Sequence, residues 1–162
     1  MAELRTSLLP DDARWSLRLP SARPLGEFAL DLPVNRASRT GERLAARLGP
    51  DEWLLVAPAS DAPDFRALEG CHHSLVDVSH RYVAFVVEGK DAPLLLAAGC
   101  PLDLHPGFFT PGSATRTLLG KAEIILWRLG EAPSYRVECA RSFAGYVERF
   151  LHEAAREWKP SC

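Results

Sequence analysis

The 162-residue sequence has no long apolar run. Its longest apolar stretches, YVAFVV at 82–87 and PLLLAAGCPL at 93–102, are far shorter than the ~20 residues that span a bilayer. The first 15 residues also lack the apolar region of roughly 7 to 15 residues that a signal peptide requires. We therefore predict a cytoplasmic protein with no membrane association.

The chain also lacks an excess of basic residues. Nineteen Lys and Arg residues stand against 21 Asp and Glu residues, which gives a net charge of −2. The arginines are scattered and interleaved with acids, whereas nucleic-acid-binding domains gather basic residues on one face. No nucleic-acid partner is expected.

The four cysteines show no spacing typical of metal or redox sites. None forms a C-x-x-C pair, and a chain of this size does not need disulfide bonds, so reduced thiols are expected. Cys71, His72 and His73 could attract a metal, but a zinc site needs three or four convergent ligands and no second ligand cluster has suitable spacing. We predict a solvated loop at these residues and no metal in this chain.

Nucleophilic and nucleotide-binding motifs are missing as well. Asp77, Ser79 and His80 have the side-chain types of a hydrolytic triad, but neighbours in an extended segment point to opposite faces, so Ser79 and His80 would diverge. The G-x-S-x-G, G-x-G-x-x-G and G-x-x-x-x-G-K-[ST] motifs are all absent. We predict a turn at residues 77–79, capped by Asp77 or Ser79, and no catalytic or cofactor-binding residue in this chain.

What is present is the composition of an ordinary globular protein, with 47% hydrophobic and 25% charged residues. Residues 1–24 contain three prolines and little periodicity, which predicts a loose N-terminal arm with at most one edge strand. Residues 25–162 are predicted to form a single domain.

Two hydrophobic periodicities predict an α+β fold. Apolar alternation or continuous apolar runs predict strands at 26–32, 42–48, 52–58, 82–87, 115–119, 123–129 and 134–140. Helices are predicted at 64–68, at 91–98 and in a C-terminal segment between Ser142 and Pro160. The order strand–strand–helix–strand occurs in both halves, which predicts two ferredoxin-like lobes with antiparallel sheets. Within 134–140, Arg136 and Glu138 alternate with apolar residues, so their face is expected to be wet.

The segment PLDLHPGFFTPG at 101–112 joins apolar side chains to Pro and Gly residues that prevent a long helix or strand. Its apolar members are Leu102, Leu104, Phe108 and Phe109. On a Pro-bounded loop, such side chains either pack into the core of their own chain or contact a partner. Composition alone favours the core, and both alternatives stay open.

Several segments resemble a known family. Residues 75–98, LVDVSHRYVAFVVEGKDAPLLLAA, resemble the amino-terminal folate domain of the glycine-cleavage aminomethyltransferases. C-P-L-D-L-x-P at 100–106, T-R-T-L-L at 115–119 and R-S-F-A at 141–144 narrow this to a resemblance to the gamma subunits of heterotetrameric sarcosine oxidase. The resemblance covers most of the chain from about Gly49 onward.

This resemblance implies a fold like the aminomethyltransferase folate-binding domain and a non-catalytic subunit that packs on an alpha subunit, with beta and delta subunits in the same complex. The complex would demethylate sarcosine oxidatively to glycine, with hydrogen peroxide and methylenetetrahydrofolate as products. FAD, FMN, NAD and tetrahydrofolate would be held by other subunits. Leu102, Leu104, Phe108 and Phe109 then become candidates for the partner interface.

An alternative is a stand-alone folate- or one-carbon-binding protein of the same fold, and a further one is an interaction module of another complex. In the wider aminomethyltransferase group, an acidic pair before the strand that matches 124–126 serves folate chemistry. Here these positions are Ala122 and Glu123, so the first acid is missing. The resemblance therefore implies weak folate binding by this chain and favours the gamma subunit.

Overall fold

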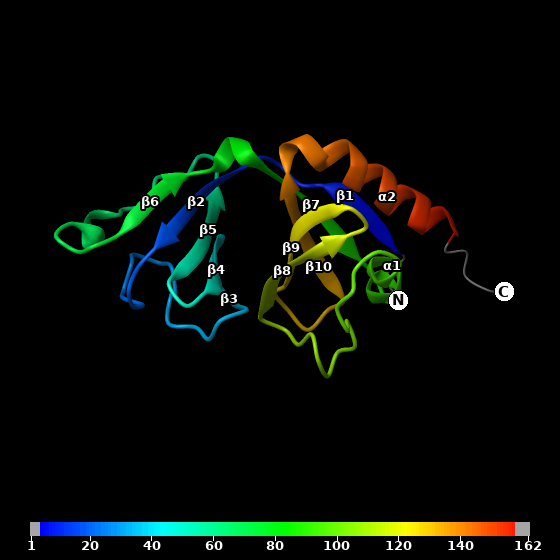
Figure 1. Ribbon diagram of the computed structural model, residues 1–162, viewed down its shortest axis with the longest axis horizontal. Coiled ribbons are helices and arrows are strands. Elements are labelled where there is room, and N and C mark those ends of the chain that lie inside the picture. Colours follow the sequence, from blue (N-terminus) through cyan, green and yellow to red (C-terminus); the bar gives the residue numbers. More distant parts are fainter. Residues whose placement is uncertain (1–3, 158–162) are drawn as a thin grey trace.

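The computed structural model describes residues 4–157, which form a strongly curved, ten-stranded antiparallel sheet with two α-helices at one end (Figure 1). The strand order is β1-β7-β10-β9-β8-β3-β4-β5-β2-β6. In chain order, β1 to β10 span Arg5–Leu8, Asp12–Arg18, Arg36–Thr40, Arg43–Gly49, Glu52–Pro58, Ser74–Asp77, Tyr82–Glu88, Ser113–Leu119, Ala122–Arg128 and Ser134–Ala140. The helices are α1 (Ala92–Ala97) and α2 (Ala144–Glu157), with short 3-10 turns at Arg66–Leu68, Ser79–Arg81 and Arg141–Phe143.

The sheet consists of two halves, here called lobes. One lobe contains β1, β7, β10, β9 and β8, and the other contains β3, β4, β5, β2 and β6. They meet where β3 pairs with β8 through Arg36 and Ser113. The predicted α+β fold with two antiparallel lobes is confirmed.

Three apolar clusters form the core of the protein. The first lies between the helices and the β7–β10–β9 face, where Val147 and Leu151 of α2 are buried. The second covers the outer face of the other lobe. The third joins the inner faces of both lobes, with Leu44 and Val56 from one and Ile125 and Trp127 from the other. Strands β5 and β9 contribute to clusters on both of their faces, which is why they read as continuous apolar runs.

The N-terminal region differs from its prediction. Residues 5–18 are not a loose arm but form β1 and β2, and β2 pairs with both β5 and β6. Polar and apolar residues alternate along β2 (DARWSLR), but Arg14, on the polar face of this strand, is fully buried. Strands β3 and β6 were also not predicted.

The predicted strand at 26–32 is wrong, because this region has only an isolated bridge between Leu25 and Phe28. Its apolar side chains nevertheless belong to the core, since Phe28 and Leu30 join the second cluster. The indole N–H of Trp53 donates to the Leu30 carbonyl at 3.0 Å and anchors this connection. Burial of Phe28 and Leu30 therefore produced a strand-like pattern in an irregular segment.

The predictions of α1 and α2 are confirmed with small shifts, whereas the helix predicted at 64–68 is only a 3-10 turn at Arg66–Leu68. Helix α1 follows Asp91, and a Cβ at Gly99 would lie 2.4 Å from Cζ of Phe150, so only glycine lets the chain leave α1 this close to α2. Helix α2 begins at Ala144, two residues after Ser142, because a 3-10 turn precedes it. The predicted end at Pro160 lies outside the described residues. No helix within residues 4–157 has the length and apolar character to cross a membrane.

Candidate functional site

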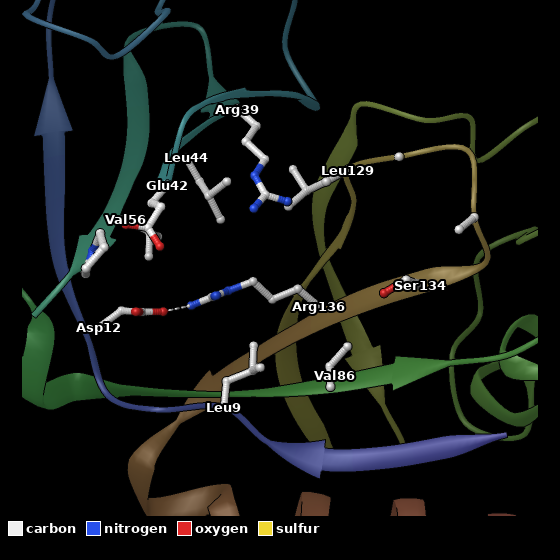
Figure 2. Close-up of a pocket in the computed structure, with 13 residues that line it drawn as sticks. Leu9, Asp12, Arg39, Glu42, Leu44, Val56, Val86, Leu129, Ser134 and Arg136 are labelled. Carbon is white, nitrogen blue, oxygen red and sulfur yellow. Dashed lines mark hydrogen bonds and ion pairs between the residues drawn. The ribbon is translucent and has the colours of Figure 1, made fainter. Parts of the chain in front are cut away.

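A cavity lies between the inner faces of the two lobes. It has a volume of about 400 Å³, within the range of small-ligand and anchor pockets, and we call it the inter-lobe cavity (Figure 2). Its apolar walls come from both lobes. The lining residues are Leu9, Leu44, Val56, Pro58, Val86, Leu129, Gly130 and Ala132, together with the polar Asp12, Arg39, Glu42, Ser134 and Arg136.

A network of four charged residues joins the lobes beside this cavity. Arg14 of β2 donates from Nε to Oε2 of Glu138 on β10 at 2.9 Å, and both side chains are 0% exposed. Arg136 donates to the other oxygen of Glu138 at 2.7 Å and to Asp12 at 2.6 Å (Figure 2). We call Asp12, Arg14, Arg136 and Glu138 the buried charge network.

The network is balanced, with two cations and two anions. Taking such charges out of water costs several kcal/mol per ion, and close pairing offsets that cost only when the geometry is good. Burial, the largest single influence, would lower the pKa of Arg136, but the attraction of Glu138 and the hydrogen bonds with Asp12 and Glu138 outweigh it, so this pKa lies above its ordinary value. Arg136 is therefore a fixed cation and not a proton donor.

The sequence did not reveal this network. The predicted wet face of 134–140 is wrong for Glu138, which is fully buried. Arg136 is only partly exposed, with 12% of its side chain accessible. Asp12 and Arg14 lie in the segment predicted to be loose. The sequence pattern of polar residues alternating with apolar ones is the same whether the polar side chains contact water or a buried counter-ion. The pattern therefore could not distinguish the two cases.

The four candidate interface residues do not form one surface. Leu104 and Phe109 are only 4% and 7% exposed, and both belong to the helix-covered core, where Phe109 stacks on Tyr135 with ring centroids 6.3 Å apart. Leu102 is partly buried against the same core. Phe108 alone projects from the loop, with 76% of its surface exposed. That Phe108 contacts a partner remains a prediction.

The turn predicted at residues 77–79 is confirmed. One carboxylate oxygen of Asp77 accepts hydrogen bonds from the N–H of Ser79 at 2.9 Å and from its hydroxyl at 2.6 Å. These hydrogen bonds, the hydroxyl first, hold the pKa of Asp77 below its ordinary value. The Ser79 oxygen also accepts from the backbone N–H of Arg14 at 2.9 Å. Ser79 is therefore bonded to Asp77 and to β2, and His80 takes no part in these bonds.

The cysteine and histidine residues within residues 4–157 do not form a set of metal ligands. The Cys71 sulfur lies 4.0 Å from Nδ1 of His73, and no group of three or more potential ligands occurs within residues 4–157. Cys100 and Cys139 are buried, and burial, reinforced by the Glu138 charge, raises the pKa of Cys139 to about 11. The Cys139 thiol therefore stays protonated and unreactive near neutral pH.

The positions that match the acidic pair of the aminomethyltransferases lie outside the inter-lobe cavity. Ala122 is fully buried in the helix-covered core, and Glu123 is exposed to solvent. Neither residue is among those that line the cavity.

Comparisons with known proteins identify relatives of this chain. A family model described as the sarcosine oxidase, gamma subunit family matches residues 22–157. The sarcosine oxidase subunit gamma of Corynebacterium sp. (strain P-1) is 37% identical over 114 residues, which are 68% of this chain and 56% of that protein. The subunit gamma of Arthrobacter sp is 37% identical over 91 residues, 54% of this chain and 45% of that protein. The chain thus matches about half the length of these relatives.

Solved structures agree with the sequence comparison. A chain of the heterotetrameric sarcosine oxidase from Corynebacterium sp. U-96 in complex with pyrrole 2-carboxylate has a TM-score of 0.85 at 26% identity, over 98% of this chain and 87% of that chain. The glycine cleavage system aminomethyltransferase T from Bartonella henselae has a TM-score of 0.68 at 14% identity, over 96% of this chain and 49% of that chain, and shares the fold. The family resemblance read from the sequence is confirmed, and the chain belongs to the sarcosine oxidase gamma subunit family.

Proposed function

We propose that this chain is the non-catalytic gamma subunit of a cytoplasmic heterotetrameric sarcosine oxidase, and that it packs on the alpha subunit of a complex with beta and delta subunits. The observation that carries the proposal is the family match over residues 22–157, supported by the TM-score of 0.85 to a chain of a heterotetrameric sarcosine oxidase. The reaction of the complex would be the oxidative demethylation of sarcosine to glycine.

The geometry of the inter-lobe cavity supports a structural role for this chain. Asp12 and Arg136 are bonded to each other, and Arg136 and Glu138 are bonded as well, so these charges are neutralised within the protein. A general acid or base needs a pKa near the working pH, and the raised pKa of Arg136 is the opposite of that requirement. A rigid subunit of this kind would help to enclose the reactive imine formed elsewhere in the complex and so shield it from water.

Co-expression tests the proposal directly. With its alpha, beta and delta subunits present, a tagged form of this chain is expected to retain all three during affinity purification and size exclusion. The purified chain alone is expected to show no sarcosine-dependent hydrogen peroxide formation. Sarcosine oxidation by the single chain, or clean separation from the other subunits at low salt, contradicts the proposal.

We also propose that the flavins, NAD and tetrahydrofolate belong to other subunits. The freshly purified chain is expected to be colourless, and calorimetric titration with tetrahydrofolate is expected to give an affinity weaker than micromolar. A charged hydrogen bond to a ligand is worth about 1.5 to 3 kcal/mol, so lacking the carboxylate at Ala122 alone weakens binding by tenfold or more. A flavin band near stoichiometry, or micromolar or tighter folate binding, supports the stand-alone folate-binding alternative instead.

A further inference from the structure

The charges around the inter-lobe cavity are of two kinds. Asp12 and Arg136 are paired with each other and with the rest of the buried charge network. Arg39, near the end of β3, and Glu42, on the turn between β3 and β4, are both exposed, and we call them the rim residues. Within residues 4–157, neither rim residue has an opposite charge within 4.0 Å. Among the charged residues that line the cavity, only the two rim residues therefore carry charges that are not already paired within residues 4–157.

Arg39 is the better placed of the two to receive a partner. Its Nε donates to the Gly41 carbonyl at 3.0 Å, which fixes the plane of the guanidinium and leaves the terminal nitrogens available. Figure 2 shows its side chain reaching over the cavity toward Leu129. A guanidinium in this position matches a carboxylate through a two-pronged hydrogen bond.

The walls beneath Arg39 match an apolar group. Leu44 and Val56 are buried members of the cluster that joins the lobes, and Val86 and Leu129 face them across the cavity. A phosphate or another dianion fits poorly, because the carboxylates of Asp12 and Glu42 line the same space. An apolar anchor that is buried beside a charged pair at the rim is the usual anatomy of a protein–protein interface.

We propose that the inter-lobe cavity receives an apolar side chain from a segment of a partner subunit, and that an acidic residue next to this side chain pairs with Arg39. The inference rests on the proposed function, in which this chain works within a heteromeric complex. Glu42 lines the cavity on the side of Val56 and repels a second acid, so the segment carries one acidic residue and not an acidic run (Figure 2). The buried charge network holds the two lobes in place, so the cavity is formed before the partner arrives and docking needs little rearrangement.

Two substitutions test the charge at the rim of the cavity and the space inside it. Arg39→Glu reverses the rim charge, and Gly130→Trp fills the opening, where a Cβ at Gly130 meets no atom within 4 Å and the backbone needs no positive φ. The matched controls lie on α2: Arg156→Glu changes an exposed arginine, and Gly145→Trp changes a glycine that also has open space around it. All four variants are expected to keep the thermal midpoint of the wild type.

Retention of the co-expressed subunits is the readout. Arg39→Glu and Gly130→Trp are expected to weaken it at least about tenfold, because the first repels the acidic residue of the partner and the second excludes its apolar side chain from the cavity, whereas both controls stay at the wild-type level. If the wild type holds its partners and the two cavity variants hold them equally well, the inference is overturned while the proposed function stands. If the wild type holds no partner, the proposed function itself fails and this inference fails with it.

A photo-crosslink identifies the occupant even where a variant folds poorly. With p-benzoylphenylalanine at position 130 in the co-expressed complex, irradiation is expected to link a partner peptide in which an acidic residue lies within two residues of an apolar one. The same amino acid at position 145 is the control and is expected to give a different peptide or none. Three results overturn the inference. They are a crosslink to a second copy of this chain, a crosslink to a partner peptide without an acidic residue, and no crosslinked peptide at all, which is the result expected if a small molecule fills the cavity.

Discussion

Replacing Glu138 by alanine is expected to lower the free energy of unfolding by about 3 to 5 kcal/mol. The substitution leaves the fully buried guanidinium of Arg14 without its counter-ion and removes one of the two anions that hold Arg136. For a chain of this length the thermal midpoint is expected to fall on the order of 10 °C. Chemical denaturation and calorimetry of the isolated chain measure both quantities.

The control is Glu123→Ala, which removes an exposed carboxylate from the neighbouring strand β9 and is expected to change stability by no more than about 0.5 kcal/mol. A double-mutant cycle separates charge from packing. Arg14→Met combined with Glu138→Leu is expected to be more stable than either single change, because the pair leaves no unmatched buried charge between these positions. Additive losses in this cycle contradict the role given to the Arg14–Glu138 pair.

The second large effect concerns two neighbouring phenylalanines with opposite environments. Phe109→Ala is expected to cost roughly 3 to 5 kcal/mol of folding stability, since it empties a buried site against Tyr135. Phe108→Ala is expected to change stability by about 0.5 kcal/mol or less, because three-quarters of that ring is already in water. If the loop faces a partner, Phe108→Ala weakens co-purification of the complex instead. Thermal unfolding and pull-down of both variants measure the two effects.

Val76→Ala is the matched control for Phe108→Ala, because it shortens another exposed apolar side chain, on the edge strand β6 at the other end of the sheet. It is expected to leave both stability and co-purification unchanged. Normal assembly with Phe108→Ala removes the loop from the interface, and an unchanged thermal midpoint for Phe109→Ala contradicts its placement in the core.

Much of the fold was predictable from hydrophobic periodicity. Strands β4, β5, β7, β9 and β10 and both α-helices appear within a few residues of their predicted positions, because each of them buries an apolar face or two. The resemblance between short segments and one family then gave the fold and the family correctly. The strands that were missed, such as β3 (RASRT) and β6 (SLVD), are short and carry few apolar residues, so their pairing depends on neighbours distant in sequence.

The candidate site was not predictable in the same way. Its defining contact joins Arg14 to Glu138, two residues separated by 124 positions, and each looks like an ordinary surface residue within its own segment. Pattern analysis assigns a charged residue to solvent unless a partner is known, and only the folded topology brings this partner close. The same reasoning explains why Leu104 and Phe109 were grouped with Phe108, since composition does not tell which side of a loop faces inward.

The separation of Arg14 and Glu138 also bears on the order in which the molecule is built during translation. At a synthesis rate of ~5 to 20 residues per second, roughly 6 to 25 seconds pass between the appearance of the arginine and that of its counter-ion. During this interval β2 can pair with β5 and β6, but Arg14 stays in contact with water because the other wall of its burial site does not yet exist. Closure of the two lobes is therefore a late step of biogenesis. The inner face of the lobe that contains β2 to β6 remains open to the surrounding solution, and to other chains, until β10 has been made.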